Sequence, residues 1–90
     1  MKNAYPIILT PERNGFTVFI PDFNINTEGK DLTDSIKMAR DAIGLMGVDM
    51  EDDKKELPIP STIDDIKAEN GEIVTLVDVD FAKYRRLRVF

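Results

Sequence analysis

Short apolar stretches separated by turn residues occupy the first third of the chain. Residues 4–10 and 16–20 are rich in β-branched and aromatic side chains, and each stretch predicts a strand. An Asn-Gly pair at positions 14–15 supplies the positive φ angles that a tight hairpin needs. Pro6 favours an edge position or the start of its strand, because proline cannot donate a ladder hydrogen bond. A shorter, more polar strand is expected over residues 24–28.

The apolar spacing then changes from two residues to three or four, which is typical of an amphipathic helix. With Asp31 as its N-cap, this helix is expected to run from about residue 32 to residue 51. Gly44 and Gly47 each weaken it by about 1 kcal/mol relative to alanine, so they indicate close approach of a neighbouring backbone. The stripe expected to face the core consists of Leu32, Ile36, Ala39, Ile43, Met46 and Met50.

The chain between this helix and the last strand contains charged residues and then prolines. Residues 51–61 are therefore expected to form a loop, and Ser61 or Thr62 to cap a small second helix over residues 63–69. A final strand is expected over residues 72–80. The element order β-β-β-α-β, with a small extra helix before the last strand, predicts an α+β fold. Its form is a two-layer sandwich of one sheet and one long helix.

One helix can cover only one face of such a sheet, so the other face should be polar. Three of the strands instead carry apolar residues on both faces, which predicts a further surface to bury. The residues opposing the main apolar set are Pro6, Ile8, Phe19, Val74 and Leu76. Met38 and Leu45 likewise lie nearly opposite the apolar stripe of the long helix. Either the second helix covers them through Ile63 and Ile66, or they belong to an interface with another protein or a second copy of this chain.

Composition restricts the chemistry available to the chain. Its 90 residues are enough for one domain, and it contains no cysteine and no histidine. The usual thiol nucleophile, general base and metal ligand are therefore missing, and we predict neither a catalytic residue nor a cofactor. The lack of cysteine in so small a domain favours a reducing compartment, so we expect a cytoplasmic protein.

The net charge of −5 is distributed unevenly along the chain. Residues 1–80 hold all 17 acidic residues and eight basic ones, whereas residues 81–90 hold four basic residues and no acidic one. The body of the domain should therefore repel nucleic acid and attract a basic partner.

Two other functions stay open on the residues alone. Asp22, Asp78 and Asp80 lie at or near strand ends and could bind magnesium, as a metal-dependent nuclease requires, although a solvated edge explains them equally well. The chain could also be a self-assembling scaffold. If its last strand lies at a sheet edge, pairing with a second copy would produce a dimer.

Several segments, taken in order, resemble the HicB family of antitoxins. They are Tyr5–Ile8 (YPII), Gly15–Phe23 (GFTVFIPDF), Thr27–Gly29 (TEG), Asp31–Ile36 (DLTDSI), Leu57–Ser61 (LPIPS), Val77–Phe81 (VDVDF) and Tyr84–Arg86 (YRR). The resemblance implies a partial ribonuclease-H-like fold without nuclease activity. It also implies a partner of the HicA type, a small basic toxin that cleaves mRNA. The antitoxin would cover the RNA-binding surface and catalytic histidine of that toxin, and would assemble as a dimer or higher oligomer.

On this resemblance, residues 1–82 form the toxin-binding domain. Residues 83–90 form a basic tail that begins a linker to a DNA-binding domain absent from this chain, so DNA would be bound only through that further domain. The expected toxin-binding residues are Pro21, Asp22, Phe23, Asn24, Glu28, Asp34, Met38 and Leu45. Asp22 would meet an arginine or lysine of the toxin. Alternatively, Asp22 shapes a turn and Asp34 belongs to the helix cap.

Overall fold

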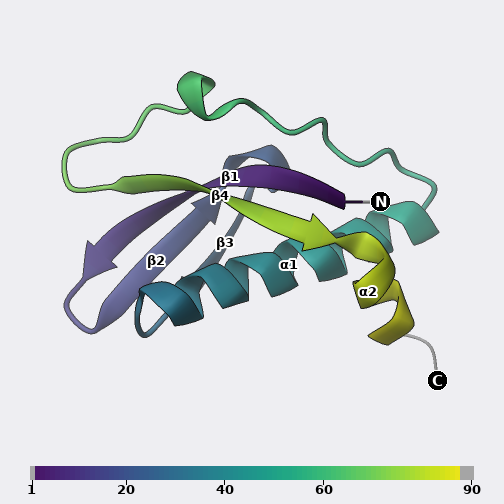
Figure 1. Ribbon diagram of the computed structural model, residues 1–90, viewed down its shortest axis with the longest axis horizontal. Helices are drawn as coiled ribbons and strands as arrows, with labels where there is room; N and C mark the ends of the chain where they lie inside the picture. Colours follow the sequence, from purple (N-terminus) through teal and green to yellow (C-terminus); the bar gives the residue numbers. More distant parts are fainter. Residues whose placement is uncertain (1, 88–90) are drawn as a thin grey trace.

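Four strands form a single antiparallel sheet in the order β3-β2-β1-β4 (Figure 1). A computed structural model describes residues 2–87. The strands are β1 (Lys2–Glu12), β2 (Gly15–Ile20), β3 (Ile25–Gly29) and β4 (Ile73–Asp80). The helices are α1 (Leu32–Asp52) and α2 (Phe81–Leu87), and two single 3-10 turns cover Pro21–Phe23 and Ile63–Asp65. The predicted α+β class and β-β-β-α-β order are confirmed.

The sheet lies between α1 and the long segment that joins α1 to β4. Figure 1 shows α1 along one side of the strands and, after Leu57 has packed against the core, residues 59–72 running back along the other side. The predicted second helix over 63–69 is wrong, since only the turn Ile63–Asp65 forms and Ile66 is already extended. The Thr62 side chain caps no backbone N–H. Its hydroxyl donates to the Asp65 carboxylate at 2.9 Å. None of residues 63–69 is buried, whereas α2, which is equally short, buries Phe81 and Tyr84, so packing does not offset the cost of helix nucleation over 63–69.

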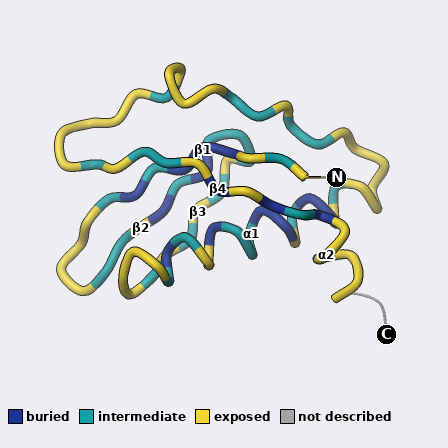
Figure 2. Tube along the Cα trace, viewed as in Figure 1, coloured by how far each residue is buried: buried dark blue, intermediate teal, exposed yellow. Residues whose placement is uncertain are grey.

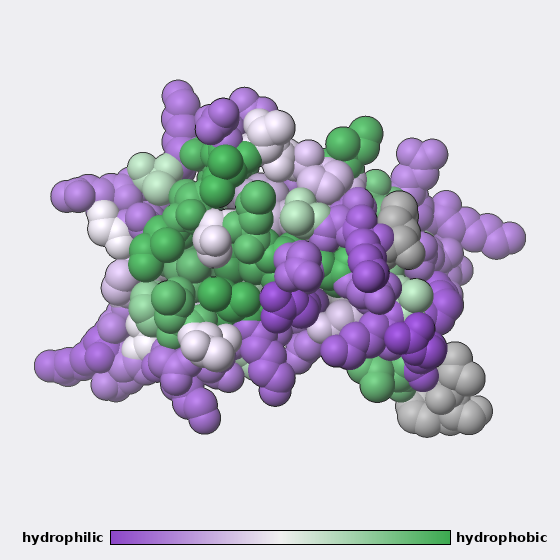
Figure 3. Space-filling view, viewed as in Figure 1, coloured by the Kyte–Doolittle hydropathy of each residue, from purple (hydrophilic) through white to green (hydrophobic). Residues whose placement is uncertain are grey.

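The core forms where the sheet faces α1. Fully buried side chains from three strands and α1 make up its centre (Figure 2): Tyr5, Ile7, Leu9, Val18, Ile20, Ala39, Ile43, Val48 and Val77. Each large apolar side chain of this kind contributes roughly 1.5–3 kcal/mol through burial. Apolar side chains are also visible at the surface over the strands, above the N-terminal half of α1 (Figure 3).

Pro6 is accommodated in the middle of the central strand because of how the strands overlap. β1 pairs with β4 from Lys2 to Leu9, but with β2 only from Ile8 onward. At Pro6, therefore, β1 has a single strand neighbour, and its missing N–H breaks no bond to β2. The prediction that Pro6 lies at an edge is correct for the part of β1 before Ile8, which has β4 as its single neighbour. It is wrong for β1 as a whole, which lies between β2 and β4.

The buried side of α1 is rotated about the helix axis relative to the predicted apolar stripe. Leu32 is exposed, whereas the buried residues are Ser35, Ala39, Ile43, Gly44, Gly47 and Val48. The shift arises because α2 covers the side that carries the two glycines. A Cβ atom on Gly44 would meet the ring of Tyr84, and one on Gly47 would meet the ring of Phe81. The glycines do mark close approach, but to aromatic side chains and not to a backbone.

Residues 83–87, expected to begin a basic tail, lie in helix α2. Phe81 and Tyr84 are buried against α1, and Arg85 forms ion pairs with Glu51 at 3.2 Å and with Asp52 at 2.9 Å. Residues 88–90 of the predicted tail lie outside the described residues. The linker to a further domain stays a prediction.

Candidate functional site

The strand register confirms that apolar residues occupy both faces of the sheet. Ile8 lies opposite Phe19 of β2 and Val74 of β4, and Pro6 lies opposite Leu76. Residues directly opposite on antiparallel strands share a face, so these five side chains lie on the face away from the buried core. Leu76 is 48% exposed, which leaves apolar area on that face accessible.

The predicted toxin-binding residues fall into separate groups, and Pro21–Asn24 form the first. Pro21–Phe23 make the 3-10 turn after β2, and Asn24 ends it with a left-handed φ of 52°. The ring of Phe23 meets that of Tyr5 edge-on at a centroid distance of 4.9 Å. The Asp22 carboxylate accepts hydrogen bonds from the Ser61 backbone N–H at 2.8 Å and from its hydroxyl at 2.5 Å. These residues therefore hold residues 53–72 to the end of the sheet.

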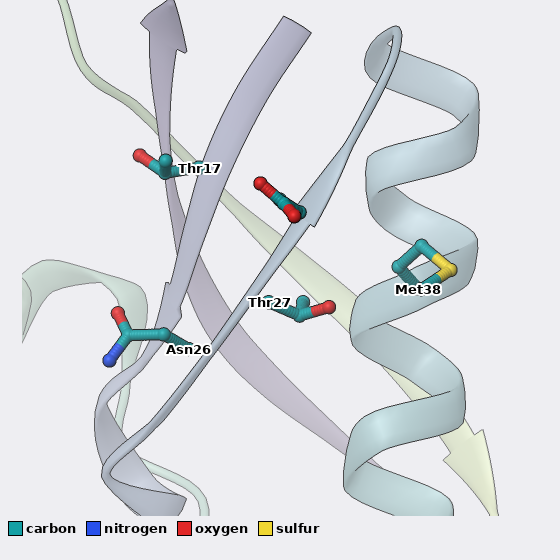
Figure 4. A pocket seen from close by; sticks show the side chains of 5 residues that line it. Thr17, Asn26, Thr27 and Met38 are labelled. Atoms are coloured by element: carbon teal, nitrogen blue, oxygen red, sulfur yellow. The ribbon is translucent and has the colours of Figure 1, made fainter.

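Glu28 and Met38 belong to a second group at the outer edge of β3. They line a hollow of about 550 Å³ together with Thr17, Asn26 and Thr27. Figure 4 shows Met38 coming from α1 and the other labelled side chains from the strands beside it. This arrangement places an exposed carboxylate and an apolar thioether on one surface, which suits a partner that offers both a cation and an apolar side chain.

Asp34 lies near Glu28 and takes part in the start of α1. Both residues line a second hollow of about 300 Å³. The Asp31 carboxylate accepts the Asp34 N–H at 2.7 Å, and the Asp34 carboxylate accepts the Lys30 N–H at 3.0 Å. This pair satisfies two backbone donors at the helix start, so Asp34 does belong to the cap.

Met38 and Leu45 remain exposed on α1, at 39% and 44%. The explanation that a second helix covers them is wrong, because no α-helix forms over residues 63–69 and both side chains stay exposed. Two turns of helix separate the two side chains, which therefore project in similar directions. Their burial by another protein stays a prediction.

The three carboxylates considered for magnesium each have other partners. Asp78 pairs with Arg40 at 3.0 Å, and this hydrogen-bonded ion pair lowers the pKa of Asp78. Asp80 accepts the Ala82 N–H at 3.1 Å, and Asp22 is bound to Ser61. Within residues 2–87, no group of three or more acidic side chains is arranged to hold a metal ion.

Comparison with known proteins assigns the family. Residues 5–89 match the sequence model of the HicB-like antitoxins of bacterial toxin–antitoxin systems. The chain belongs to this family. A comparison with curated protein sequences finds no match.

Two solved structures resemble this antitoxin. A toxin–antitoxin complex from Streptococcus pneumoniae has a chain with a TM-score of 0.82 and 20% identity, covering 93% of this chain and 73% of that one. A complex of HicA3 and HicB3 has a chain with a TM-score of 0.70 and 27% identity, covering 87% of this chain and 99% of that one. The first supports the fold alone, and the second associates the fold with a complex of the HicA and HicB type.

The α1–α2 contact of the antitoxin is a feature that the sequence did not reveal. The Tyr84 hydroxyl donates to the Asp41 carboxylate at 2.6 Å. Burial, together with this hydrogen bond, raises the pKa of Tyr84 to about 12. The spacing of Phe81 and Tyr84, three residues apart before a run of arginines, is the signal that could have predicted a docked helix. Among the described residues, no helix of the antitoxin is both long and apolar enough to cross a bilayer.

This pKa leads to a pH-dependent stability. In the unfolded chain Tyr84 should lose its proton near its ordinary pKa of 10, whereas in the folded chain it keeps the proton to about pH 12. Its stabilising contribution is therefore complete below pH 10 and is lost as the pH rises through about 12. We expect urea unfolding to show stability falling between pH 10 and 12, and falling less steeply in Tyr84→Phe. Equal slopes in the two proteins would contradict the assignment.

Proposed function

We propose that this antitoxin neutralises a HicA-type toxin by binding it and covering the surface with which the toxin engages RNA. The family match carries this proposal, since it makes the chain an antitoxin of a toxin–antitoxin system. The resemblance to a chain of the HicA3–HicB3 complex supports a toxin of the same type as partner. The antitoxin would act in the cytoplasm, where mRNA is translated.

Charge supports the choice of a basic, RNA-binding partner. The chain has a net charge of −5, and exposed Glu28 stands beside Met38 and Thr27 at the edge of β3. An acidic surface accelerates association with a basic protein and opposes association with nucleic acid. Exposed apolar side chains such as Met38, Leu45 and Leu76 would provide the contacts that hold the complex together. No step of this proposal requires catalysis by the antitoxin.

The test is an RNA-cleavage assay with a purified HicA-type toxin. We expect toxin activity to fall in proportion to added antitoxin and to vanish at a fixed molar ratio. Raising the salt concentration should slow association because it screens the charge attraction. Toxin that cleaves RNA at its full rate in the presence of saturating antitoxin would refute the proposal.

Two further properties belong to the proposal. The antitoxin would form a dimer or higher oligomer, and contact with DNA would be made by a separate C-terminal domain and not by residues 2–87. Arg40 donates to the Asp78 carbonyl oxygen at 2.9 Å, so the C-terminal half of β4 is less accessible to a second copy than its N-terminal half. Light scattering on the purified chain measures the oligomeric state.

A further inference from the structure

The two edges of the sheet differ in how far they are protected. β3 and β4 are the outermost strands, so each has one strand neighbour. On β4, the Arg40 guanidinium donates both to the Asp78 backbone carbonyl and to its carboxylate, at 2.9 and 3.0 Å. On β3, the residues at the middle of the strand border an open hollow. β3 is therefore the less protected of the two edges, and another strand can add there.

The backbone groups that β3 offers can be identified from its pairing with β2. The Gly29 carbonyl oxygen lies against Gly15 of β2, so the backbone polar groups of Gly29 point toward the sheet. These groups alternate in direction along an antiparallel strand. Those of Asn26 and Glu28 therefore point outward, and an added strand could exchange hydrogen bonds with both residues.

Side chains beside this edge favour a particular kind of partner. Thr27 and Met38 line the hollow of about 550 Å³ next to β3, and Met38 is 39% exposed (Figure 4). Alternate side chains of an added strand would project toward this hollow, and an apolar one would bury the thioether. The exposed carboxylate of Glu28 would face a side chain on the added strand directly.

Charge decides between a second copy and a different protein. Glu28 and Asp34 lie at the same end of β3 and line one hollow together with a single cation, Lys30, so the charge of this hollow is negative. A second copy would bring its own Glu28 and Asp34, and a net charge of −5, to this edge. Like charges across paired strands destabilise, whereas a lysine or arginine opposite Glu28 stabilises. The edge is thus complementary to a basic chain.

We propose that β3 extends its sheet with a strand from a basic partner protein, which places a lysine or arginine against Glu28 and an apolar side chain over Met38. The inference rests on the proposed function, in which that partner is the toxin. Backbone hydrogen bonds to Asn26 and Glu28 would align the added strand. The hollow beside Met38 and the Glu28 carboxylate would determine which side chains that strand must carry.

The test compares variants at this edge with matched variants elsewhere. Asn26→Pro removes one outward N–H without touching the β2 ladder, Glu28→Lys reverses the charge, and Met38→Lys removes the apolar contact. Glu56→Lys and Ile59→Lys, both at exposed positions on the segment after α1, are the matched controls for charge reversal and for loss of an apolar side chain. The probe is the HicA-type toxin with its catalytic histidine replaced, and titration calorimetry measures Kd.

We expect each β3-edge variant to weaken toxin binding at least about tenfold, and each control to stay within about threefold. Thermal unfolding confirms that the variants are folded. Asn26→Pro changes the backbone of β3 and could prevent folding. Met38→Lys and Glu28→Lys change only exposed side chains, so these two variants decide the test in that case. Unaltered affinity in both of these folded variants would overturn the inference and leave the proposed function intact.

Two other results would count against the inference. If the unaltered chain does not bind the toxin at all, the proposed function fails and this inference fails with it. If the chain forms a dimer in light scattering, and Glu28→Lys or Met38→Lys dissociates that dimer without changing toxin affinity, the β3 edge joins two copies of this chain.

Discussion

Replacing Tyr5 with alanine should lower the free energy of unfolding by about 4 kcal/mol, a large fraction of the stability of a domain this small. Tyr5 is fully buried, and its ring packs edge-on against Phe23 at 4.9 Å and Phe81 at 6.3 Å. Its hydroxyl donates to the Pro58 carbonyl oxygen at 2.8 Å. The substitution therefore loosens the turn after β2, helix α2 and residues 53–72 together. Urea unfolding followed by circular dichroism measures the loss.

Tyr5→Phe is the matched control. It keeps the ring and removes only the hydroxyl, so it should cost about 1 kcal/mol for the lost bond to Pro58. The large difference between the two variants is the expected result. If alanine and phenylalanine lowered the stability equally, ring packing at this position would not be the main source of stability.

Replacing Gly44 with alanine should destabilise the fold by about 2 kcal/mol, although alanine favours a helix by about 1 kcal/mol over glycine. The reason is that the added Cβ atom meets the ring of Tyr84. Relief would require α2 to move away from α1, and with it the hydrogen bond from Tyr84 to Asp41. Thermal and urea unfolding both measure the effect.

A double variant separates the two contributions. When Tyr84 is also replaced by alanine, the steric conflict is absent and only the helix preference remains. Gly44→Ala should then stabilise the Tyr84→Ala protein by up to about 1 kcal/mol. A stabilising effect of Gly44→Ala in the unaltered chain would mean that α2 does not rest against Gly44.

The strands and the long helix could be predicted because they depend on local patterns. The change of apolar spacing and the Asp31 cap located α1, whose observed bounds are Leu32–Asp52. Its buried face could not be predicted in the same way. Periodicity scores side chains, whereas the surface facing α2 is built from Gly44 and Gly47, which have none. The position of α2 on α1 is therefore specified by the aromatic rings of α2, Phe81 and Tyr84.

The candidate site was predictable only in part. Glu28 and Met38 were proposed separately, and the structure brings them together because α1 lies beside β3. Asp22 was proposed to meet a toxin cation, yet its carboxylate binds Ser61, 39 positions further along the chain. Such long-range hydrogen bonds leave no periodic signal in the sequence, so a carboxylate that tethers a loop cannot be distinguished there from one that faces a partner.

The central position of β1 sets the order in which the fold can be completed during synthesis. β1 leaves the ribosome before the other three strands, whereas β4, which pairs with it from Lys2 to Leu9, leaves after them. The first three strands and α1 can assemble earlier, but one side of β1 stays unpaired until residues 73–80 emerge. A nascent chain therefore carries an open apolar strand edge, and the complete sheet exists only once translation has passed β4.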